Sequence, residues 1–175
     1  MRYVLHLIVM VLVWGNMEVV HALDTGSRES LRGIFGVGLV VEEVGPDASA
    51  DGLSQDAIRT AVEQTLRSKG IRVLTERTRS GSAPYLYVNV NTLKEQLGLY
   101  VYAVNVDLKQ IVGLLTGKGK QAWGATWSAS VIGMAREENL SQVIAEGVEP
   151  LVTDFANDFL SVNTRLEPAP RRNPN

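Results

Sequence analysis

The hydrophobic and polar positions of the chain follow a period of two over its middle third. Apolar and polar side chains alternate over residues 85–91, again over 99–108, and a third time over 121–134. Successive side chains of a strand point to opposite faces of a sheet, so this period predicts three strands. Because only short connections separate them, the three are expected to pair as an antiparallel meander.

The segment before this meander predicts a strand, helix, strand unit. Residues 34–44, rich in Val and Gly, are expected to form the first strand, and residues 71–75 a short second one. Between them, apolar side chains recur three and four residues apart in a helix that begins after the N-cap Ser54 and ends before Gly70. A right-handed parallel crossover is the expected connection.

The C-terminal part predicts a long amphipathic helix over residues 139–162, with Asn139 as its N-cap. Pro150 lies inside this pattern and has no N–H to donate, so we expect a kink or a break there. Residues 164–175 are rich in Pro and Arg and are expected to be disordered. The sequence therefore predicts one α/β domain over residues 23–163.

These elements together predict an α/β (α+β) two-layer sandwich, with both helices on one face of a sheet of about five strands. The hydrophobic alternation fixes which side chains face the helices. The expected buried set is Leu86, Val88, Val90, Tyr102, Val104, Val106, Leu108, Trp123 and Trp127. The expected outward set is Tyr85, Tyr87, Asn89, Asn105, Asp107, Lys109, Thr126, Ser128 and Ser130.

The first 22 residues have the pattern of a cleaved secretory signal peptide. Arg2 gives a positive start, residues 4–14 form an apolar run interrupted only by His6, and Val20-His21-Ala22 supplies a small-x-small cleavage motif. The run is shorter than the roughly 20 residues that span a bilayer. The expected location is periplasmic or secreted, with no stable membrane insertion after removal of the leader. An uncleaved anchor and a buried first strand are the alternatives.

Cleavage there would leave a protein with neither histidine nor cysteine. The chain has no Cys, and its two histidines, His6 and His21, both lie in the leader. Catalytic triads, Cys-His pairs and nearly all transition-metal sites need one of these residues. We therefore expect no enzyme, no cofactor and no metal. The carboxylates Asp154 and Asp158 share one helix face, where solvated surface groups are the expected interpretation.

The charge pattern argues against a nucleic-acid partner. The formal net charge is −2, and loss of residues 1–22 removes one base, Arg2, and one acid, Glu18, which leaves it unchanged. Binding to phosphates favours a clustered positive excess. Acids gather over residues 42–56 and bases over 67–79, at the two ends of the first helix, where they complement its dipole.

The outward face of the meander carries the candidate binding residues. Aromatic rings lie there beside amides and one carboxylate, the combination found in many binding sites. The candidates are Tyr85, Tyr87, Asn89, Asn105 and Asp107. The alternative is that this face is only the solvated side of an antiparallel sheet.

Several short segments carry a resemblance to known proteins. They are Gly52-Leu53-Ser54, LRSKGIRV at 66–73, Tyr85-Leu86-Tyr87-Val88, the strand at 100–112, Ala125-Thr126-Trp127 and FANDFLSVN at 155–163. Over residues 31–163 the chain resembles an uncharacterised family of exported bacterial α/β proteins. In layout it is loosely similar to the periplasmic adaptor domains of the curli secretion channel and of the Tol–Pal propeller protein. The resemblance implies a binding or scaffolding module without catalytic residues, although the anchoring Cys of lipid-anchored members is absent.

Three functions are compatible with these observations. The first is an exported, non-catalytic binding or adaptor domain of the bacterial cell envelope, which would hold a protein partner on its open sheet face or on a strand edge. The second is a small-ligand or glycan-binding module that uses Tyr85 and Tyr87 as stacking surfaces. The third is a carboxylate-dependent hydrolase, which needs two acidic side chains across a cleft about 5 to 9.5 Å apart.

Overall fold

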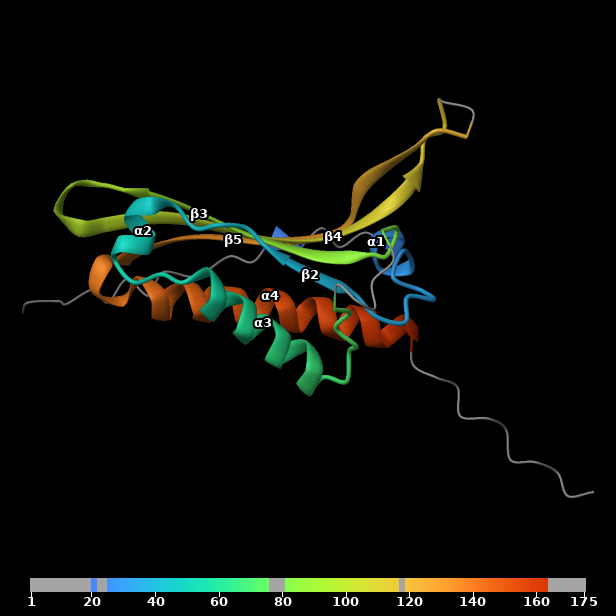
Figure 1. Cartoon of the computed structure of the whole chain (residues 1–175), viewed down its shortest axis with the longest axis horizontal. Helices are drawn as coiled ribbons and strands as arrows, with labels where there is room; N and C mark the ends of the chain where they lie inside the picture. The colour runs from blue at the N-terminus through green and yellow to red at the C-terminus, as the bar shows by residue number, and fades with distance from the viewer. Residues whose placement is uncertain (1–19, 22–24, 76–80, 117–118, 164–175) are drawn as a thin grey trace, which may run out of the picture.

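One mixed sheet and the helices on one side of it form the two layers of this protein (Figure 1). The structure is a computed structural model, and it describes residues 20–21, 25–75, 81–116 and 119–163. The strands are β1 (Val20–His21), β2 (Gly38–Val41), β3 (Tyr85–Lys94), β4 (Leu99–Gly113) and β5 (Gln121–Arg136). The helices are α1 (Thr25–Glu29), α2 (Pro46–Ala50), α3 (Gln55–Ser68) and α4 (Leu140–Asn163), with 3₁₀ turns η1 (Gln96–Gly98) and η2 (Glu137–Asn139). The predicted α+β sandwich is confirmed.

The sheet has the strand order β1-β5-β4-β3-β2. Strands β3, β4 and β5 form the predicted antiparallel meander, in which Val88 lies opposite Val106 and Val106 opposite Ala129. Strand β2 pairs in parallel with β3, so the crossover through α3 returns to the sheet at β3. The predicted second strand at 71–75 is wrong. That segment makes a single parallel bridge, Val37 to Val73, in which Val37 donates to the Arg72 carbonyl at 3.0 Å and accepts from the Leu74 N–H at 2.8 Å.

Helix α3 matches its sequence prediction at both ends. The Ser54 hydroxyl accepts a hydrogen bond from the backbone N–H of Ala57 at 3.3 Å, which satisfies one of the free N–H groups of the first turn. Gly70 follows the helix with φ +80°, a backbone conformation that costs glycine little. The buried stripe of α3 contains Ile58, Val62 and Leu66.

Helix α4 continues through Pro150, so of the predicted kink or break the break is wrong, and the kink stays a prediction. A proline inside a helix costs about 3 kcal/mol or more. The residues that follow it, Leu151, Val152 and Phe155, are all fully buried, and their burial offsets that cost. Asn139 also differs from its predicted role, since its Oδ1 accepts from the N–H of Arg136 and thus caps η2.

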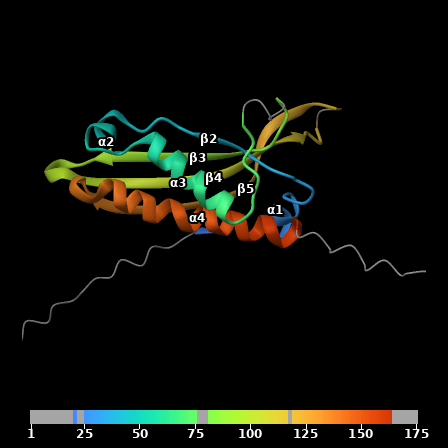
Figure 2. The ribbon, with the colours of Figure 1, turned by 60° about the horizontal axis from the view of Figure 1, so that its bottom comes forward.

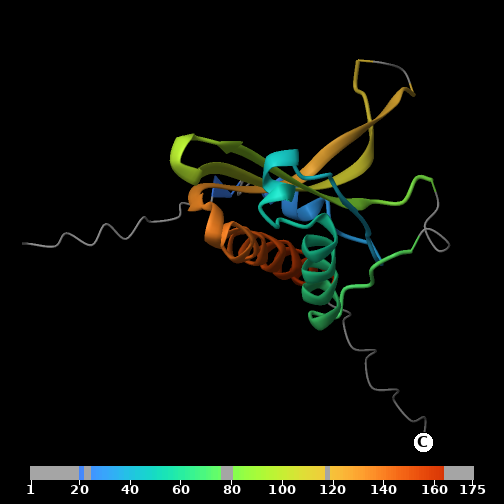
Figure 3. The same ribbon diagram turned by 60° about the vertical axis from the view of Figure 1, so that its left-hand side comes forward.

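The core lies between the sheet and the pair α3 and α4, which share one side of the sheet in Figures 2 and 3. Of the predicted buried set, all but Trp123 are buried. The rings of Trp127 and Phe155 meet edge to face with centroids 5.2 Å apart.

The carboxylate of Asp158 has two protein partners. Trp127 Nε1 donates to one of its oxygens at 3.0 Å, and Arg28 donates to the other at 2.9 Å. The prediction of a merely solvated Asp158 is therefore wrong.

The ends of the chain fall mostly outside the described residues. This holds for the predicted leader at 1–22, apart from β1, and for the predicted disordered tail at 164–175. Strand β1 pairs antiparallel with β5, with Val20 opposite Ser130. Cleavage after Ala22 stays a prediction. Within the described residues, no helix combines the length and apolar character needed to cross a membrane.

Candidate functional site

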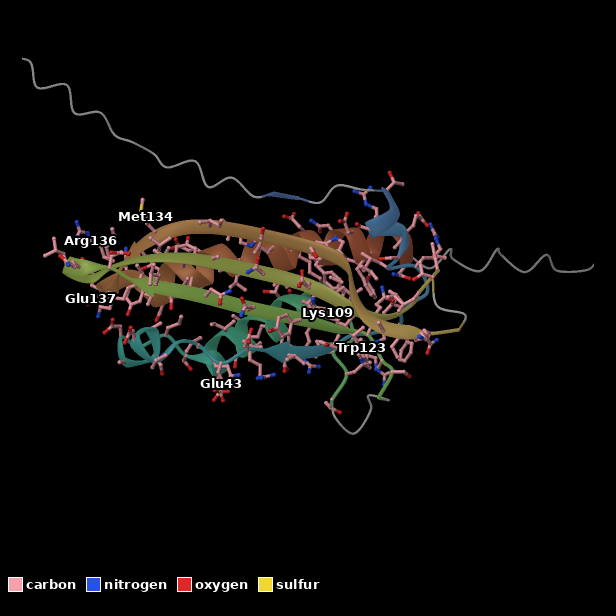
Figure 4. The ribbon with its side chains drawn as sticks, turned by 90° about the horizontal axis from the view of Figure 1, so that it is seen from above. Glu43, Lys109, Trp123, Met134, Arg136 and Glu137 are labelled. Atoms are coloured by element: carbon pink, nitrogen blue, oxygen red, sulfur yellow. The ribbon has the colours of Figure 1, made fainter. Side chains whose placement is uncertain are left out.

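In the described part of the chain no helix covers the second face of the sheet, which we call the open face (Figure 4). Its side chains alternate with the buried ones along each strand. The residues of the open face are Tyr85, Tyr87, Asn89, Asn91 and Leu93 of β3, Val101, Ala103, Asn105, Asp107 and Lys109 of β4, and Ser128, Ser130, Ile132 and Met134 of β5. All five predicted site residues lie on this face.

Glu42, just beyond the end of β2, ties two of these candidates together. The Tyr87 hydroxyl and the Asn89 Nδ2 both donate to the same Glu42 carboxylate oxygen. The parallel pairing of β2 with β3 places Glu42 there, since its own N–H donates to the Val88 carbonyl at 2.9 Å. Donation to a carboxylate favours the protonated phenol and, together with burial, raises the pKa of Tyr87 to about 12.

Asp107 and Lys109 form an ion pair next to this network. Their Oδ2 and Nζ atoms lie 2.9 Å apart, and both side chains are about one quarter exposed, at 22% and 26%. The Lys109 ammonium also lies 5.6 Å from the centre of the Tyr87 ring, within the range of a cation–π contact. Asn105 lies two positions before Asp107 on β4, where it is flanked by Asn89 on β3 and Ser130 on β5. The predicted residues thus form one connected polar half of the open face.

Trp123 joins this half of the face, which corrects its predicted place in the core. The side chain is 45% exposed, and its ring centroid lies 5.1 Å from that of Tyr85 at an interplanar angle of 57°. A β-bulge explains the error. Leu108 pairs with Trp127, whereas Lys109 pairs with Ala125, so Thr126 is an extra residue that reverses the inside and outside positions of β5.

The side chains of Gln110 and Ser30 both form hydrogen bonds with the bulge residue, Thr126. Gln110 Nε2 donates to the Thr126 hydroxyl at 2.6 Å and to the Ser30 carbonyl at 3.0 Å, while the Ser30 hydroxyl donates to the Thr126 carbonyl at 3.2 Å. The Thr126 side chain is therefore hydrogen-bonded at the bulge and, contrary to the prediction, does not face outward with Ser128 and Ser130.

Trp123 also lines a shallow depression of about 280 Å³ on the open face. It is lined by Val40, Gly81, Ala83, Tyr85, Tyr87 and Trp123.

The other half of the open face is apolar. Leu93, Val101, Ile132 and Met134 are 61%, 37%, 71% and 68% exposed. The strand register places Leu93 opposite Val101 and Val101 opposite Met134, and Ile132 lies two positions from Met134 on the same side of β5. The four side chains are therefore neighbours on one surface, which we call the apolar patch. Figure 4 shows Met134 toward one end of the sheet and Lys109 and Trp123 toward the other. The alternation places these residues outward, but it does not single them out as a group.

The ionisable groups of the open face already have protein partners. Glu42 accepts from Tyr87 and Asn89, and Asp107 is paired with Lys109. Among the described residues, no three His, Cys, Asp or Glu side chains lie close enough to hold a metal ion. The arrangement offers hydrogen-bonding groups, aromatic rings and apolar surface to a bound molecule.

No protein-family profile matches the sequence, and no curated protein matches it. Among the solved structures that are similar to this chain, two share 10% sequence identity with it. A minor lipoprotein from Acinetobacter baumannii aligns with a TM-score of 0.34 over 74% of this chain and 90% of that one. The rare lipoprotein B from Shewanella oneidensis aligns with a TM-score of 0.29 over 71% and 91%. At these scores the likeness carries no argument about fold or function, and it does not show the similarity to curli or Tol–Pal adaptor domains.

Proposed function

We propose that this protein is an exported, non-catalytic binding domain of the bacterial cell envelope and that it holds a protein partner on its open face. The observation that carries the proposal is the apolar patch. Isolated apolar side chains on a surface are common, but here four adjoining ones remain exposed on the uncovered side of a sheet. Such contiguous patches mark interaction surfaces in soluble proteins.

Affinity and orientation would come from different halves of the face. Burial of each large apolar side chain stabilises a complex by about 1.5 to 3 kcal/mol before the entropic cost of association, so Leu93, Ile132 and Met134 can supply the affinity. The network of Glu42, Tyr87 and Asn89 presents hydrogen-bonding groups in fixed positions. Polar groups of this kind select among partners that are similarly apolar.

The location in this proposal rests on the sequence of the leader. Export followed by removal of residues 1–22 would leave a domain without histidine or cysteine, which favours binding over catalysis. The proposed location is the periplasm or the exterior of the cell.

Site-specific photocrosslinking in cells tests the proposal. A photoreactive amino acid at Ile132 is expected to give one discrete protein adduct, whereas the same residue at Gln64, on the exposed side of α3, gives none. Met134→Asp should abolish the adduct at Ile132 because it puts an unpaired charge into the interface. Equal adducts at Ile132 and Gln64, or an adduct that survives Met134→Asp, would remove the open face as the partner site.

A second candidate is favoured by the position of Trp123. Its ring, with those of Tyr85 and Tyr87, lines the depression, and Lys109 and Asp107 lie beside it. Aromatic rings next to polar groups are typical of glycan sites. Binding of an oligosaccharide that is lost both in Trp123→Ala and in Tyr87→Ala with Asp107→Ala, but kept in Met134→Asp, would support this function. Loss only in Met134→Asp would exclude it.

A further inference from the structure

The hairpin of β4 and β5 extends beyond the rest of the sheet. Strand β3 pairs with β4 only as far as Tyr85 opposite Lys109, whereas β4 and β5 continue to pair as far as Gly113 opposite Gln121. This two-stranded end projects from the body of the molecule in Figures 1 and 3. Its last ladder contact is the bond from the Leu114 N–H to the Lys120 carbonyl at 2.9 Å.

Two adjacent leucines occupy the tip of this hairpin, and the packing of the fold does not explain them. Leu114 is 44% exposed, and Leu115 is as exposed as a residue can be, at 105%. Both follow the end of β4, where a turn normally carries small or polar residues. The whole side chain of Leu115 and the exposed part of Leu114 are therefore available to an external apolar phase.

The charged residues in the sequence of this hairpin end have one sign. Residues 110–135 contain no acid, and their two charged residues are Lys118 and Lys120. The chain as a whole has a formal net charge of −2, so this stretch departs from the average of the molecule. Trp123 lies two positions before the end of the ladder, roughly 7 Å along the strand from Gln121 at ~3.3 Å per residue.

The hairpin of β3 and β4 provides an internal contrast. It also exposes leucines, Leu97 at 98% and Leu99 at 37%. Charges of both signs lie near them, however. Glu95 precedes that turn, Lys94 Nζ lies 3.0 Å from the Glu137 carboxylate, and Arg136 lies opposite Leu99. The two hairpin ends thus expose similar leucines but differ in charge, since acids and bases are mixed at one end and only lysines follow the leucines at the other.

We propose that the tip of the β4–β5 hairpin docks reversibly on an anionic lipid bilayer. Leu114 and Leu115 enter the boundary between headgroups and acyl chains, Lys120 contacts the anionic headgroups, and Trp123 lies at the depth where aromatic rings are enriched. Two leucines and a few lysines give weak binding, which holds the domain near the surface without inserting it. This inference goes beyond the proposed function and involves none of the residues of the apolar patch.

A pair of single fluorescent labels tests the contact directly. The chain has no cysteine, so a thiol introduced at Thr116 or at Gln96 takes an environment-sensitive dye at one position only. With the exported protein and vesicles of phosphatidylcholine containing about one third phosphatidylglycerol, the Thr116 label should shift to shorter wavelength and brighten. The Gln96 label, in the hairpin of β3 and β4 where acids and bases are mixed, should not change. Each label reports on its own position, so lipid contacts made elsewhere do not imitate the result.

Matched variants then separate lipid binding from other causes. Leu114→Ser with Leu115→Ser should weaken vesicle partitioning at least tenfold, whereas Leu97→Ser with Leu99→Ser should leave it unchanged. Lys120→Glu, or a rise in salt from about 0.05 to 0.5 M, should weaken it because the attraction is electrostatic.

Three outcomes would overturn the proposal. The first is an unresponsive Thr116 label, and the second is equal binding to vesicles of phosphatidylcholine alone. The third is a Thr116 shift that appears without vesicles as the protein concentration rises, which would assign the tip to contacts between two copies of the chain. None of these outcomes bears on photocrosslinking at Ile132, so the two proposals fail separately.

Discussion

The two faces of the sheet are formed by the same strands but differ in the burial and the polarity of their side chains. On the covered face, side chains such as Val104 and Val106 are fully buried against helices. In the part of the chain that the structure describes, every buried side-chain nitrogen or oxygen has a hydrogen-bond partner, as in the bond of Trp127 to Asp158. On the open face, Tyr87 and Asn89 form polar networks, while Ile132 remains 71% exposed. The contrast teaches that hydrophobicity alone does not assign a position to the core here, because apolar residues occur on both sides of β5.

The largest expected effect distinguishes stability from surface function. Phe155→Ala should lower the free energy of unfolding by about 3 to 5 kcal/mol, because it empties the space between Trp127 and Phe159. Ile132→Ala, a similar loss of apolar atoms on the open face, should change it by no more than about 0.5 kcal/mol. Urea unfolding of both variants measures the difference. Equal losses would mean that the open face is part of the fold's core.

Glycines of the two faces should differ in the same way. A Cβ on Gly133 would lie 2.5 Å from the hydroxyl oxygen and 2.7 Å from Cζ of Tyr102, on the covered face. Gly133→Ala should therefore destabilise the protein by about 1 to 3 kcal/mol through overpacking. Gly113→Ala is the matched control, since nothing lies within 4 Å of that position. Thermal unfolding midpoints of the two variants measure the effect, and a tolerant Gly133 would show that Tyr102 can move aside.

At the edge of the covered face, the stability of the protein should depend on the ionisation of Asp51 at acid pH. The buried Tyr100 ring extends its hydroxyl to Asp51 at 2.5 Å, and Lys94 donates to the same oxygen at 2.6 Å. These bonds, that of Lys94 foremost, lower the pKa of Asp51 in the folded protein. The stabilisation is therefore fully present above the unfolded-state pKa of about 3.9 and is lost as the pH falls from there through the folded-state pKa.

Urea unfolding between about pH 7 and pH 2 measures this effect in the native protein and in Asp51→Asn. The native protein should be the more stable one at neutral pH, and the difference should shrink below about pH 4. A difference that stays constant over the whole range would mean that the Asp51 charge does not contribute.

The smallest expected effect on stability lies on the open face and appears at alkaline pH. The pKa of Tyr87 is raised to about 12 by its bond to Glu42, so the folded state holds this proton more tightly than the unfolded state does. Its contribution is fully present below about pH 10 and is lost as the pH rises from 10 through 12. The absorbance of phenolate, taken as the difference from Tyr87→Phe, measures the midpoint. Glu42→Gln should move that midpoint down toward 10, and an unmoved midpoint would contradict the assigned cause.

The sequence predicted most of the fold because the informative signals are local. Ser54 and Gly70 mark the ends of α3, and the alternation from Tyr85 to Leu108 gives the faces of β3 and β4. Pro150 misled the prediction of α4, because tertiary burial outweighs a local penalty there. The predicted strand at 71–75 was wrong for the opposite reason, since its apolar residues are not matched by a ladder longer than the one bridge to Val37.

The candidate site was predicted less completely, because two of its members depend on long-range pairing. Glu42 lies in a run of acids, and only the parallel register of β2 with β3 brings it to Tyr87 and Asn89. Trp123 is displaced by a bulge that no local residue preference announces. The five predicted residues could be recognised from the local sequence, because polar and aromatic side chains occur there at every second position.

The bulge at Thr126 separates the face that Trp123 occupies from the odd and even count along the sequence. Side chains of β5 point inward at odd positions from Trp127 onward, and outward at odd positions before it. Deleting this one threonine would leave Trp127 opposite Leu108 and Ala125 opposite Lys109 as successive pairs, so Trp123 would stay outward, opposite Ile111. The aromatic wall of the depression would therefore survive the loss of this codon, whereas the bond between the Thr126 hydroxyl and Gln110 would be lost.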